Sequence, residues 1–494
     1  MNLTFYFSGH DCEYEARNTL RIFDLNIDYT IEEAETIRLN DNSGLGLLCS
    51  FEENGGEAYA QAFLYSDDNL LFSSKYSSND IILENQSKKR LKKILIIKCI
   101  YKVLKSYYNI TPDYGILTGV RVVKILITAL ENHKTTEEIL KIFRDTYEVK
   151  EDKIKLIWDI FNIEKKYLNK EINKGNYNLY IGIPFCPSKC SYCSFTSFVN
   201  SKEDKVNEYI KTLVYETEET IKMARDKELN LNTIYIGGGT PSILNESQIN
   251  SIFEPIKKYY DLSNIKEITF EAGRPDTITL EKLQCLKNNM VNRISINPQT
   301  MNEKTLERIG RNHSVKDILE KYALAKSIGF SSINMDIILG LPGENEEDVE
   351  NTISEIIKLK PENITVHALA YKKKSELTRE SNEFHKDYDI IDKMHEIVME
   401  VCDKNNYMPY YMYRQKNIKG NSENIGFTLK NKEGIYNIII IEEAETILSC
   451  GLGASSKIKM RNGKHTPLIN FKSLEEYKKR IDEIIKRKKE LLNL

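Results

Sequence analysis

Proline and glycine are scarce in this chain, and neither sign of charge is in excess. The 494 residues include 11 prolines and 23 glycines, too few for a collagen-like or low-complexity chain. Hydrophobic residues make up 41% of the sequence, which is enough apolar matter to offset the entropy lost on folding. The chain is about three times the usual domain length, so we expect it to be globular throughout, with two or three cores.

The charge balance and the hydropathy pattern argue against two kinds of partner. Seventy Lys and Arg residues oppose 73 Asp and Glu residues, so the net charge of −3 creates no general attraction to nucleic-acid phosphates. The most apolar run, 94–104, is interrupted by Lys98 and Lys102, and no cationic stretch leads into an apolar core at the start. We therefore expect a cytoplasmic protein with no membrane span and no nucleic-acid partner.

Nine cysteines are present, and an odd number argues against a disulfide framework. Six stand alone, as reduced thiols usually do in cytosolic proteins. These six are Cys12, Cys49, Cys99, Cys285, Cys402 and Cys450. The other three, Cys186, Cys190 and Cys193, fall within eight residues and indicate a shared role.

The predicted elements divide the chain into three parts. Residues 1–170 form an accessory α+β region, with strand-like runs at 45–51 and 57–65 and helical patterns at 88–108 and 135–170. Residues 171–380 alternate apolar strands with amphipathic helices. Residues 381–494 have a looser pattern and are predicted to form a cap or substrate region.

The middle part has six predicted strands with helical patterns between them. The strands are 180–183, 233–236, 267–271, 293–296, 333–339 and 364–369, and the helices include 203–227, 246–260, 314–328 and 346–359. Such alternation requires a parallel sheet covered by helices, and right-handed crossovers curl it toward a barrel. Since a closed barrel needs eight units, we predict an α/β fold with a partial (β/α)6 barrel of the TIM type.

The last part is predicted to contain a helix at 386–404, strands at 425–429 and 435–442, and a charged terminal helix from Leu474. The terminal run 478–492 is interpreted as the solvated face of a helix rather than as a binding arm.

The three clustered cysteines have the spacing Cys-x3-Cys-x2-Cys and directly follow the first barrel strand. Three thiolates at this spacing can wrap a loop around one face of a metal cluster. A structural zinc site normally has four ligands, and no His lies between residues 134 and 312 to complete one. A four-iron four-sulfur (4Fe-4S) cluster held by three Cys would leave one iron open. We favour this cluster over zinc or a redox thiol pair.

A glycine-rich turn follows the second strand at 235–242. Its residues Gly238, Gly239 and Thr240 let the backbone come close to a ligand and could offer free N–H groups to it. Three glycines in a tight turn are common, so this signal is weak by itself.

Polar residues also follow or interrupt the next three strands, at the end of a barrel where active sites form. Glu271 ends the third strand, and Gln299 and Arg311 follow the fourth. Asp336 lies inside the fifth strand, where a buried charge is costly without a partner. We expect Asp336 to face a ligand or a cation rather than to form an ordinary buried ion pair.

The cysteine spacing, its place after the first strand and Tyr192 before the last Cys resemble the radical S-adenosylmethionine (SAM) superfamily. The resemblance implies one 4Fe-4S cluster held by Cys186, Cys190 and Cys193, whose open iron binds SAM. Reductive cleavage of SAM would then yield a 5′-deoxyadenosyl radical that abstracts hydrogen from carbon. It also implies a low-potential electron donor such as flavodoxin or ferredoxin.

Taken in order, the motifs resemble the oxygen-independent coproporphyrinogen III oxidase (coproporphyrinogen dehydrogenase) family, and most closely its HemZ-type branch. The likeness covers roughly 110–460 and includes 116–121, 364–375, 410–427 and 451–457. It implies conversion of two propionates of coproporphyrinogen III to vinyl groups, giving protoporphyrinogen IX for haem biosynthesis. Tyr180 is expected to act with the cysteines. Whether a second SAM molecule binds is left open. The residues expected around SAM are Tyr180, Tyr192, Gly238, Gly239, Thr240, Glu271, Gln299, Arg311 and Asp336.

A tetrapyrrole with four carboxylates requires cations at the rim of its site and apolar walls. The candidate cations are Arg274, Lys372, Lys373, Lys374, Arg414 and Lys416, which lie beside Tyr410, Tyr411 and Tyr413. Taken singly, each is better explained as a solvated surface charge, whereas the set as a whole could equally recognise carboxylates. His367, near the end of the sixth strand, could contact the substrate or a porphyrin iron, or be an ordinary hydrogen-bonded His.

One residue departs from the family pattern. Related sequences commonly have His two residues after the first Tyr of the cysteine motif, whereas this chain has Gly182. Three alternatives also stay open. They are a haem-binding or haem-transfer protein on the same fold, another radical SAM enzyme of tetrapyrroles such as one that opens the haem ring, and a zinc-stabilised interaction module.

Overall fold

The structure is a computed structural model of the chain. It describes residues 2–23, 28–33, 44–66, 69–85, 87–119, 121–169, 173, 175–194, 197–370, 388–415, 422–460 and 463–493. The described residues divide into two compact units: those within 1–162 and 413–423 form the first, and those within 163–370, 388–412 and 424–493 form the second.

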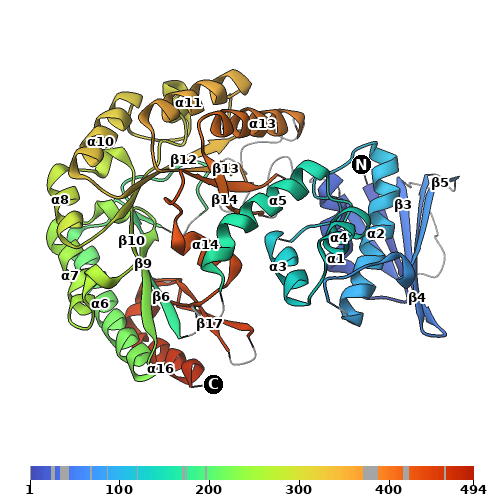
Figure 1. Ribbon diagram of the computed structural model, residues 1–494, viewed down its shortest axis with the longest axis horizontal. Helices are drawn as coiled ribbons and strands as arrows, with labels where there is room; N and C mark the ends of the chain where they lie inside the picture. Colours follow the sequence, from blue (N-terminus) through green and yellow to red (C-terminus); the bar gives the residue numbers. More distant parts are fainter. Residues whose placement is uncertain are drawn as a thin grey trace. The chain divides into compact units, whose positions relative to one another are not determined.

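The second unit is built on a curved sheet of 11 strands, in the order β14-β15-β13-β12-β11-β10-β9-β6-β16-β17-β18 (Figure 1). Six neighbouring strands run parallel and follow one another in sequence. They are β6 (Asn176–Ile183), β9 (Asn230–Gly238), β10 (Glu267–Gly273), β11 (Arg293–Ile296), β12 (Ser332–Leu339) and β13 (Asn363–Ala368). The predicted six-strand parallel core of a partial barrel is therefore confirmed.

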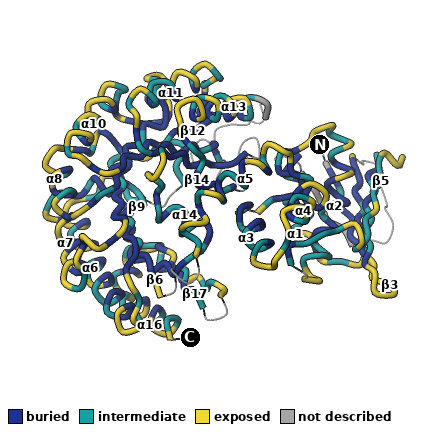
Figure 2. Tube along the Cα trace, viewed as in Figure 1, coloured by how far each residue is buried: buried dark blue, intermediate teal, exposed yellow. Residues whose placement is uncertain are grey.

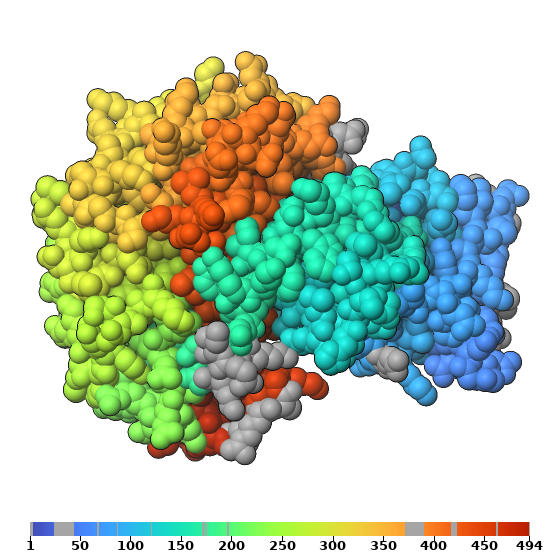
Figure 3. All heavy atoms as spheres, in the orientation of Figure 1, coloured from blue at the N-terminus to red at the C-terminus, as the bar shows by residue number. Residues whose placement is uncertain are grey.

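Helices cover the outer face of this sheet. They are α6 (Glu203–Asp226), α7 (Glu246–Lys257), α8 (Leu280–Asn288), α9 (Glu303–Arg308), α10 (Val315–Ile328), α11 (Glu346–Leu359) and α13 (Tyr388–Lys404). The strands are buried and the helices expose their outer sides (Figure 2), as expected for a parallel sheet with covered faces. In Figure 3, α13 lies beside α11 on the surface, although 28 residues separate the two helices in sequence.

Local signals explain where several helices begin and end. Helices α7, α10 and α11 start with capping boxes. In α11, the Asn345 side chain accepts a hydrogen bond from the Asp348 N–H, and the Asp348 carboxylate accepts one from the Asn345 N–H. Helix α10 ends at Gly329, whose φ of +79° lies in the left-handed region that favours glycine.

Residues of the predicted third part extend both edges of the sheet. On one edge, β15 (Asn424–Thr428) pairs antiparallel with β13, and β14 (Met408–Tyr413) follows it. On the other edge, β16 (Thr446–Cys450) pairs parallel with β6, followed by β17 (Ser455–Lys459) and β18 (His465–Ile469). Helices α15 (Leu474–Lys479) and α16 (Ile481–Leu492) end the chain. Because these strands complete the barrel sheet, residues 424–494 belong to the same unit as the barrel.

The predicted strand at 435–442 is wrong, because these residues form helix α14 (Ile435–Glu442). Its isoleucines favour a strand locally. The Glu267 carboxylate, however, accepts hydrogen bonds from the N–H groups of Ile435 and Tyr436 at 2.7 and 3.1 Å. This carboxylate satisfies the first free N–H groups of the helix and places a negative charge at its N-terminus. Figure 1 shows α14 on the concave side of the sheet.

The first unit contains a five-stranded sheet in the order β2-β1-β3-β4-β5. Its strands are β1 (Asn2–Ser8), β2 (Asp28–Glu33), β3 (Leu45–Asn54), β4 (Glu57–Ser66) and β5 (Asn69–Ser77). Its helices are α1 (Glu13–Phe23), α2 (Lys88–Tyr108), α3 (Val123–Glu131), α4 (Thr136–Lys141) and α5 (Glu151–Glu164), which runs into the second unit. Helix α2 packs on β3, β4 and β5. The strands predicted at 45–51 and 57–65 and the helix at 88–108 are present, whereas the pattern at 135–170 is broken between α4 and α5.

No helix among the described residues is both long enough and apolar enough to cross a bilayer.

Candidate active site

The cysteine loop leaves β6 and folds back on itself. Strands β7 (Phe185–Cys186) and β8 (Phe198–Val199) pair with each other, and the Phe198 N–H donates to the Pro184 carbonyl at 2.8 Å. The Cys193 N–H donates to the Cys190 carbonyl at 3.0 Å. Cys186 and Cys190 are each 9% exposed, and Cys193 is half-buried. The three thiols therefore lie on one short, self-closed loop at the carboxyl end of the first barrel strand.

The glycine turn after β9 packs directly against this loop. The N–H groups of Gly239 and Thr240 donate to the carbonyls of Ile183 and Phe185, each at 2.8 Å. The Thr240 hydroxyl lies 3.4 Å from Cys186 Sγ. A Cβ atom at Gly239 would lie 2.9 Å from the same sulfur, so only glycine fits there. The turn thus supports the first cysteine. The N–H groups of Gly238, Gly239 and Thr240, which we expected to be free for a ligand, are all bonded within the protein.

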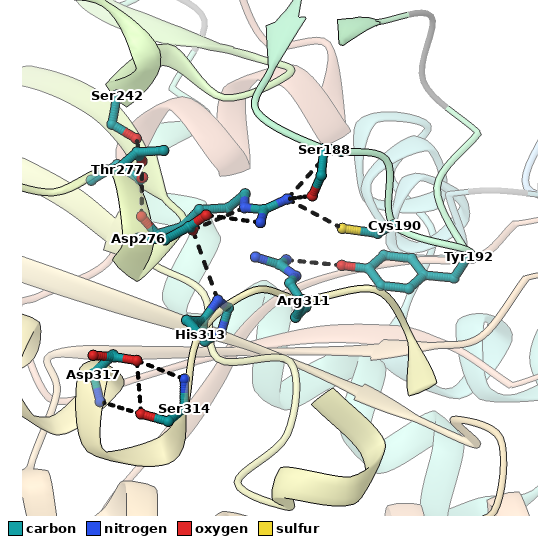
Figure 4. Close-up of polar contacts among 12 residues, drawn as sticks. Ser188, Cys190, Tyr192, Ser242, Asp276, Thr277, Arg311, His313, Ser314 and Asp317 are labelled. Atoms are coloured by element: carbon teal, nitrogen blue, oxygen red, sulfur yellow. Dashed lines mark hydrogen bonds and ion pairs between the residues drawn. The ribbon is translucent and has the colours of Figure 1, made fainter. Parts of the chain in front are cut away.

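Arg311 lies on the other side of the loop and carries donors without partners. Its Nη2 donates to the Tyr192 hydroxyl at 2.8 Å (Figure 4). Arg311 is 8% exposed, yet its Nε and Nη1 have no hydrogen-bond partner among the described residues. Tyr192 is held in place by packing on an apolar cluster, which comprises Ile309, Ile338, Leu341 and Leu369. Buried guanidinium donors without partners fit an anionic ligand.

Gln299 follows β11 in a conformation that non-glycine residues rarely adopt. Its φ is +70°, and its backbone bridges to β12 through hydrogen bonds with Asp336 and Ile338, both at 2.9 Å. Its side-chain Oε1 is buried without a partner among the described atoms. The backbone of Gln299 is thus strained and is fixed by Asp336 and Ile338, while its side-chain acceptor is unpaired. This combination is typical of a ligand-binding position.

Two predicted carboxylates lie on neighbouring parts of the sheet in contrasting environments. Glu271 accepts hydrogen bonds from the Tyr235 hydroxyl at 2.6 Å and from the Gly238 N–H at 3.1 Å. Burial raises the pKa of Glu271 to about 7, with a further contribution from the Asp336 charge. Burial also acts to raise the pKa of Asp336, but His367 and a hydrogen bond from Asn334 at 2.6 Å hold it below its usual value. At neutral pH, Asp336 is therefore ionised and Glu271 is partly protonated.

The pKa of Glu271 predicts a pH-dependent stability. Because the folded chain raises this pKa from 4.5, the stabilisation by the protonated carboxyl is lost as the pH rises through 7. Glu271→Gln cannot ionise and therefore does not lose this stabilisation. Its free energy of unfolding, relative to that of the native protein, should be about 2 kcal/mol higher at pH 8 than at pH 5. Urea unfolding at both pH values measures the change.

A matched variant controls for this result. Because the pKa of Asp336 is lowered from 3.8, this carboxyl is ionised in both the folded and the unfolded chain above pH 5, so the stability difference between Asp336→Asn and the native protein should stay the same between pH 5 and pH 8. If the stability difference between Glu271→Gln and the native protein were equal at pH 5 and pH 8, the raised pKa of Glu271 would be contradicted.

A row of tyrosines lines the inner side of the sheet beside these carboxylates. The ring of Tyr235 stacks on Tyr436 of α14 and on Tyr180, with centroids 4.6 and 6.2 Å apart. A Cβ at Gly182 would lie 3.3 Å from the Tyr180 ring. The ring of Tyr180 therefore covers the position from which the usual His side chain would extend.

The structure gives two of the predicted substrate cations other partners. Arg274 is 4% exposed and binds Asp276 and the cysteine loop. Arg414 is 3% exposed and lies in the first unit, where its Nη1 donates to the Leu117 carbonyl at 2.6 Å and its guanidinium stacks 4.3 Å from the Tyr114 ring centroid. Arg414 thus binds Leu117 of the 116–121 signature segment within the first unit.

The remaining substrate candidates have different outcomes. His367 lies beside the SAM candidate Asp336, with Nε2 3.8 Å from Oδ2. Tyr410 and Tyr411 are buried, not at a rim. Lys372, Lys373, Lys374 and Lys416 lie outside the described residues.

The contacts of Arg414 predict a stability effect. Arg414→Met removes a charged hydrogen bond from a buried carbonyl and should lower the free energy of unfolding by about 2 kcal/mol. Arg17→Met, which removes an exposed ion pair, should change it by less than about 0.5 kcal/mol. Chemical denaturation of both variants tests this. A rise in the KM for substrate without loss of stability would instead support the predicted carboxylate contact.

Several residues at the site carry no motif that would have singled them out. Ser188 and Asp276 bind Arg274, and His313 is buried with Nδ1 3.9 Å from Asp276 Oδ1. Asp276 does follow Glu271 by five residues, and His313 follows Arg311 by two. Their spacing from those residues was the only available signal.

Among the described residues, no three His, Cys, Asp or Glu side chains are close enough together to hold one metal ion.

The architecture agrees with that of known proteins. Residues 180–356 match the family model of the radical SAM superfamily. Coproporphyrinogen III oxidase (HemN) of Escherichia coli, a radical SAM enzyme, has a TM-score of 0.52 and 20% identity, over 64% of this chain and 71% of that chain. The fold is therefore that of a radical SAM protein.

Sequence similarity identifies the family within this superfamily. The chain is 38% identical over 415 residues to the oxygen-independent coproporphyrinogen-III oxidase-like protein HemZ of Bacillus subtilis, over 83% of this chain and 82% of HemZ. It belongs to this HemZ-like family of radical SAM enzymes, as predicted. The heme chaperone HemW of the same organism is 37% identical over 197 residues, which is 40% of this chain and 51% of HemW.

Proposed function

We propose that this protein converts propionate side chains of coproporphyrinogen III to vinyl groups without oxygen, giving protoporphyrinogen IX. The observation that carries the proposal is the likeness to HemZ, which extends over 83% of the chain. That likeness runs well beyond residues 180–356, the part shared with the superfamily at large. Similarity confined to the barrel would support only the shared chemistry of SAM.

The three cysteines would hold a 4Fe-4S cluster and would leave it open to SAM. The unpartnered Nε and Nη1 of Arg311 and Oε1 of Gln299 fit a charged, polar ligand at this position. When bound, the cluster and SAM supply a radical that abstracts a hydrogen atom from carbon. The electron would come from a flavodoxin- or ferredoxin-like donor.

The polar residues around the loop would bind and orient SAM. Arg311, oriented by Tyr192, would bind an anionic group of SAM such as its carboxylate. Asp336 is ionised and would accept hydrogen bonds from hydroxyl or amino groups. Glu271 is committed to Tyr235 and the Gly238 N–H and would shape the same wall.

The conversion of each propionate to a vinyl group requires no general base, because its atoms and electrons balance without the removal of a proton. Loss of a hydrogen atom from the carbon attached to the pyrrole leaves a radical that the ring delocalises. Release of carbon dioxide and transfer of one electron to an acceptor then leave the vinyl group. His367, beside Asp336, would face the reacting side chain.

A second function is favoured by the similarity to HemW. The heme chaperone HemW of Bacillus subtilis is 37% identical to this chain over 197 residues. On this alternative, the protein would bind haem on the same fold and would not decarboxylate a porphyrinogen, since one fold supports both functions.

An anaerobic assay distinguishes the two functions. The reconstituted protein would receive SAM, a low-potential reductant and either coproporphyrinogen III or haem. Product masses lower by one and two formic acid equivalents, together with 5′-deoxyadenosine, would support decarboxylation. A haem spectrum without 5′-deoxyadenosine from coproporphyrinogen III would overturn it in favour of haem binding, and a ring-opened haem product would overturn both.

A further inference from the structure

Arg274 is fully engaged at the cysteine loop rather than free for a substrate. It follows β10 and is 4% exposed. Its Nη1 donates to the Ser188 hydroxyl at 2.7 Å and carbonyl at 3.3 Å, and lies 4.0 Å from Cys190 Sγ (Figure 4). One edge of the guanidinium therefore holds the middle of the loop, between the first two cysteines.

The other edge of Arg274 is fixed by a carboxylate. Its Nε and Nη2 donate to the two carboxylate oxygens of Asp276 at 3.0 and 2.9 Å, which is the bidentate geometry that orients a guanidinium best. The Asp276 side chain also partly offsets the charge of Arg274. Asp276 and Ser188 together leave Nη1 directed at the Cys190 sulfur.

A guanidinium in this position would act on any cluster that Cys190 holds. Arginine stays protonated at every accessible pH, so its charge is permanent. Hydrogen bonds to cluster sulfurs and nearby charges set the reduction potential of iron–sulfur clusters. The reduced cluster carries one more negative charge than the oxidised one, so a buried cation beside a ligand sulfur favours reduction.

We propose that Arg274, oriented by Asp276, is a positioning residue that fixes the Cys190 side of the loop and raises the reduction potential of the cluster. The inference rests on the proposed cluster and adds a role for residues next to it. Loss of the Arg274 charge makes reduction harder, whereas loss of the Asp276 charge makes it easier. A purely structural role would move the potential in the same direction for both.

The test is a redox titration of the full-length protein, reconstituted anaerobically with iron and sulfide and followed by electron paramagnetic resonance without SAM. For Arg274→Gln, the ratio of reduced to oxidised cluster at the native midpoint should fall about tenfold, which is 59 mV for a one-electron couple. Arg274→Lys should show a smaller fall, and Asp276→Asn should show a rise. Arg308→Gln is the matched control, because Arg308 also binds a backbone carbonyl, that of Pro342, but does not hold the loop.

The outcomes separate this inference from the proposed function. Opposite shifts in Arg274→Gln and Asp276→Asn support it. An unchanged midpoint in Arg274→Gln, or equal shifts in the control, overturns it while leaving the cluster intact. If Arg274→Gln binds no cluster, the Asp276→Asn variant decides: a higher reduction potential supports the inference, and a lower one overturns it. A native protein that binds no cluster overturns the proposed function and this inference together.

Discussion

Replacing Cys190 with alanine is expected to abolish SAM cleavage and every porphyrin product while leaving the chain folded. Cys190 is one of only three cysteines on the loop, so a cluster with a second open iron would not be retained. The loop keeps its other supports, including the hydrogen bond from the Ser191 N–H to the Ile309 carbonyl at 3.2 Å. Iron and sulfide content, 5′-deoxyadenosine and porphyrin masses measure the loss, and circular dichroism checks the fold.

Cys285→Ala is the matched control for this variant. Cys285 is also buried in the second unit, but its Sγ contacts the Glu246 carbonyl and Asn250 instead of the cysteine loop. Full activity of Cys285→Ala, with none in Cys190→Ala, is the expected pair of results. Turnover by Cys190→Ala at the native rate would contradict the assignment of the cluster to this loop.

Replacing Lys488 with methionine is expected to lower the free energy of unfolding by about 3 to 5 kcal/mol. Lys488 of α16 forms an ion pair with Glu216 of α6 at 2.6 Å, and neither side chain is exposed. Removal of the ammonium leaves the buried carboxylate without its charge partner, and this desolvation cost exceeds the loss of packing. Figure 1 shows α16 beside α6, so the pair joins the end of the chain to the barrel.

Lys486→Met controls for the loss of a lysine from the same helix. The Lys486 side chain is 76% exposed, so its removal should cost less than about 0.5 kcal/mol. The double variant Glu216→Gln/Lys488→Met should be more stable than Lys488→Met alone, because it has no unpaired buried charge. Urea denaturation of all three variants measures these differences. Equal stabilities of Lys486→Met and Lys488→Met would contradict the buried pair.

The Glu216 carboxylate also explains the signature segment 451–457, to which the sequence alone assigned no role. It accepts a hydrogen bond from the Gly451 N–H at 2.7 Å. A Cβ at Gly451 would lie 2.6 Å from the Gly182 carbonyl oxygen, which itself accepts a hydrogen bond from Tyr209 at 2.5 Å. This segment therefore supports the first barrel strand just before the cysteine loop.

The alternation of apolar strands and amphipathic helices was sufficient to predict the six parallel strands, because a buried parallel strand has the same local signature wherever it occurs. Prediction failed at 435–442, where a segment with five isoleucines, which favour a strand by composition, forms α14. The Glu267 carboxylate that stabilises the start of this helix is 168 residues away. No local pattern contains such a contact.

The amino-acid sequence by itself determined the parallel barrel core, the loop of three cysteines and the family, because periodicity and ligand spacing are local properties of the chain. Only the tertiary structure decided the partners of charged side chains. Arg274 and Arg414 look alike in sequence as candidate substrate cations, yet one meets Asp276 and the cysteine loop and the other meets the Leu117 carbonyl. A buried charge is stable only beside the groups that the fold brings to it, and those groups come from distant segments.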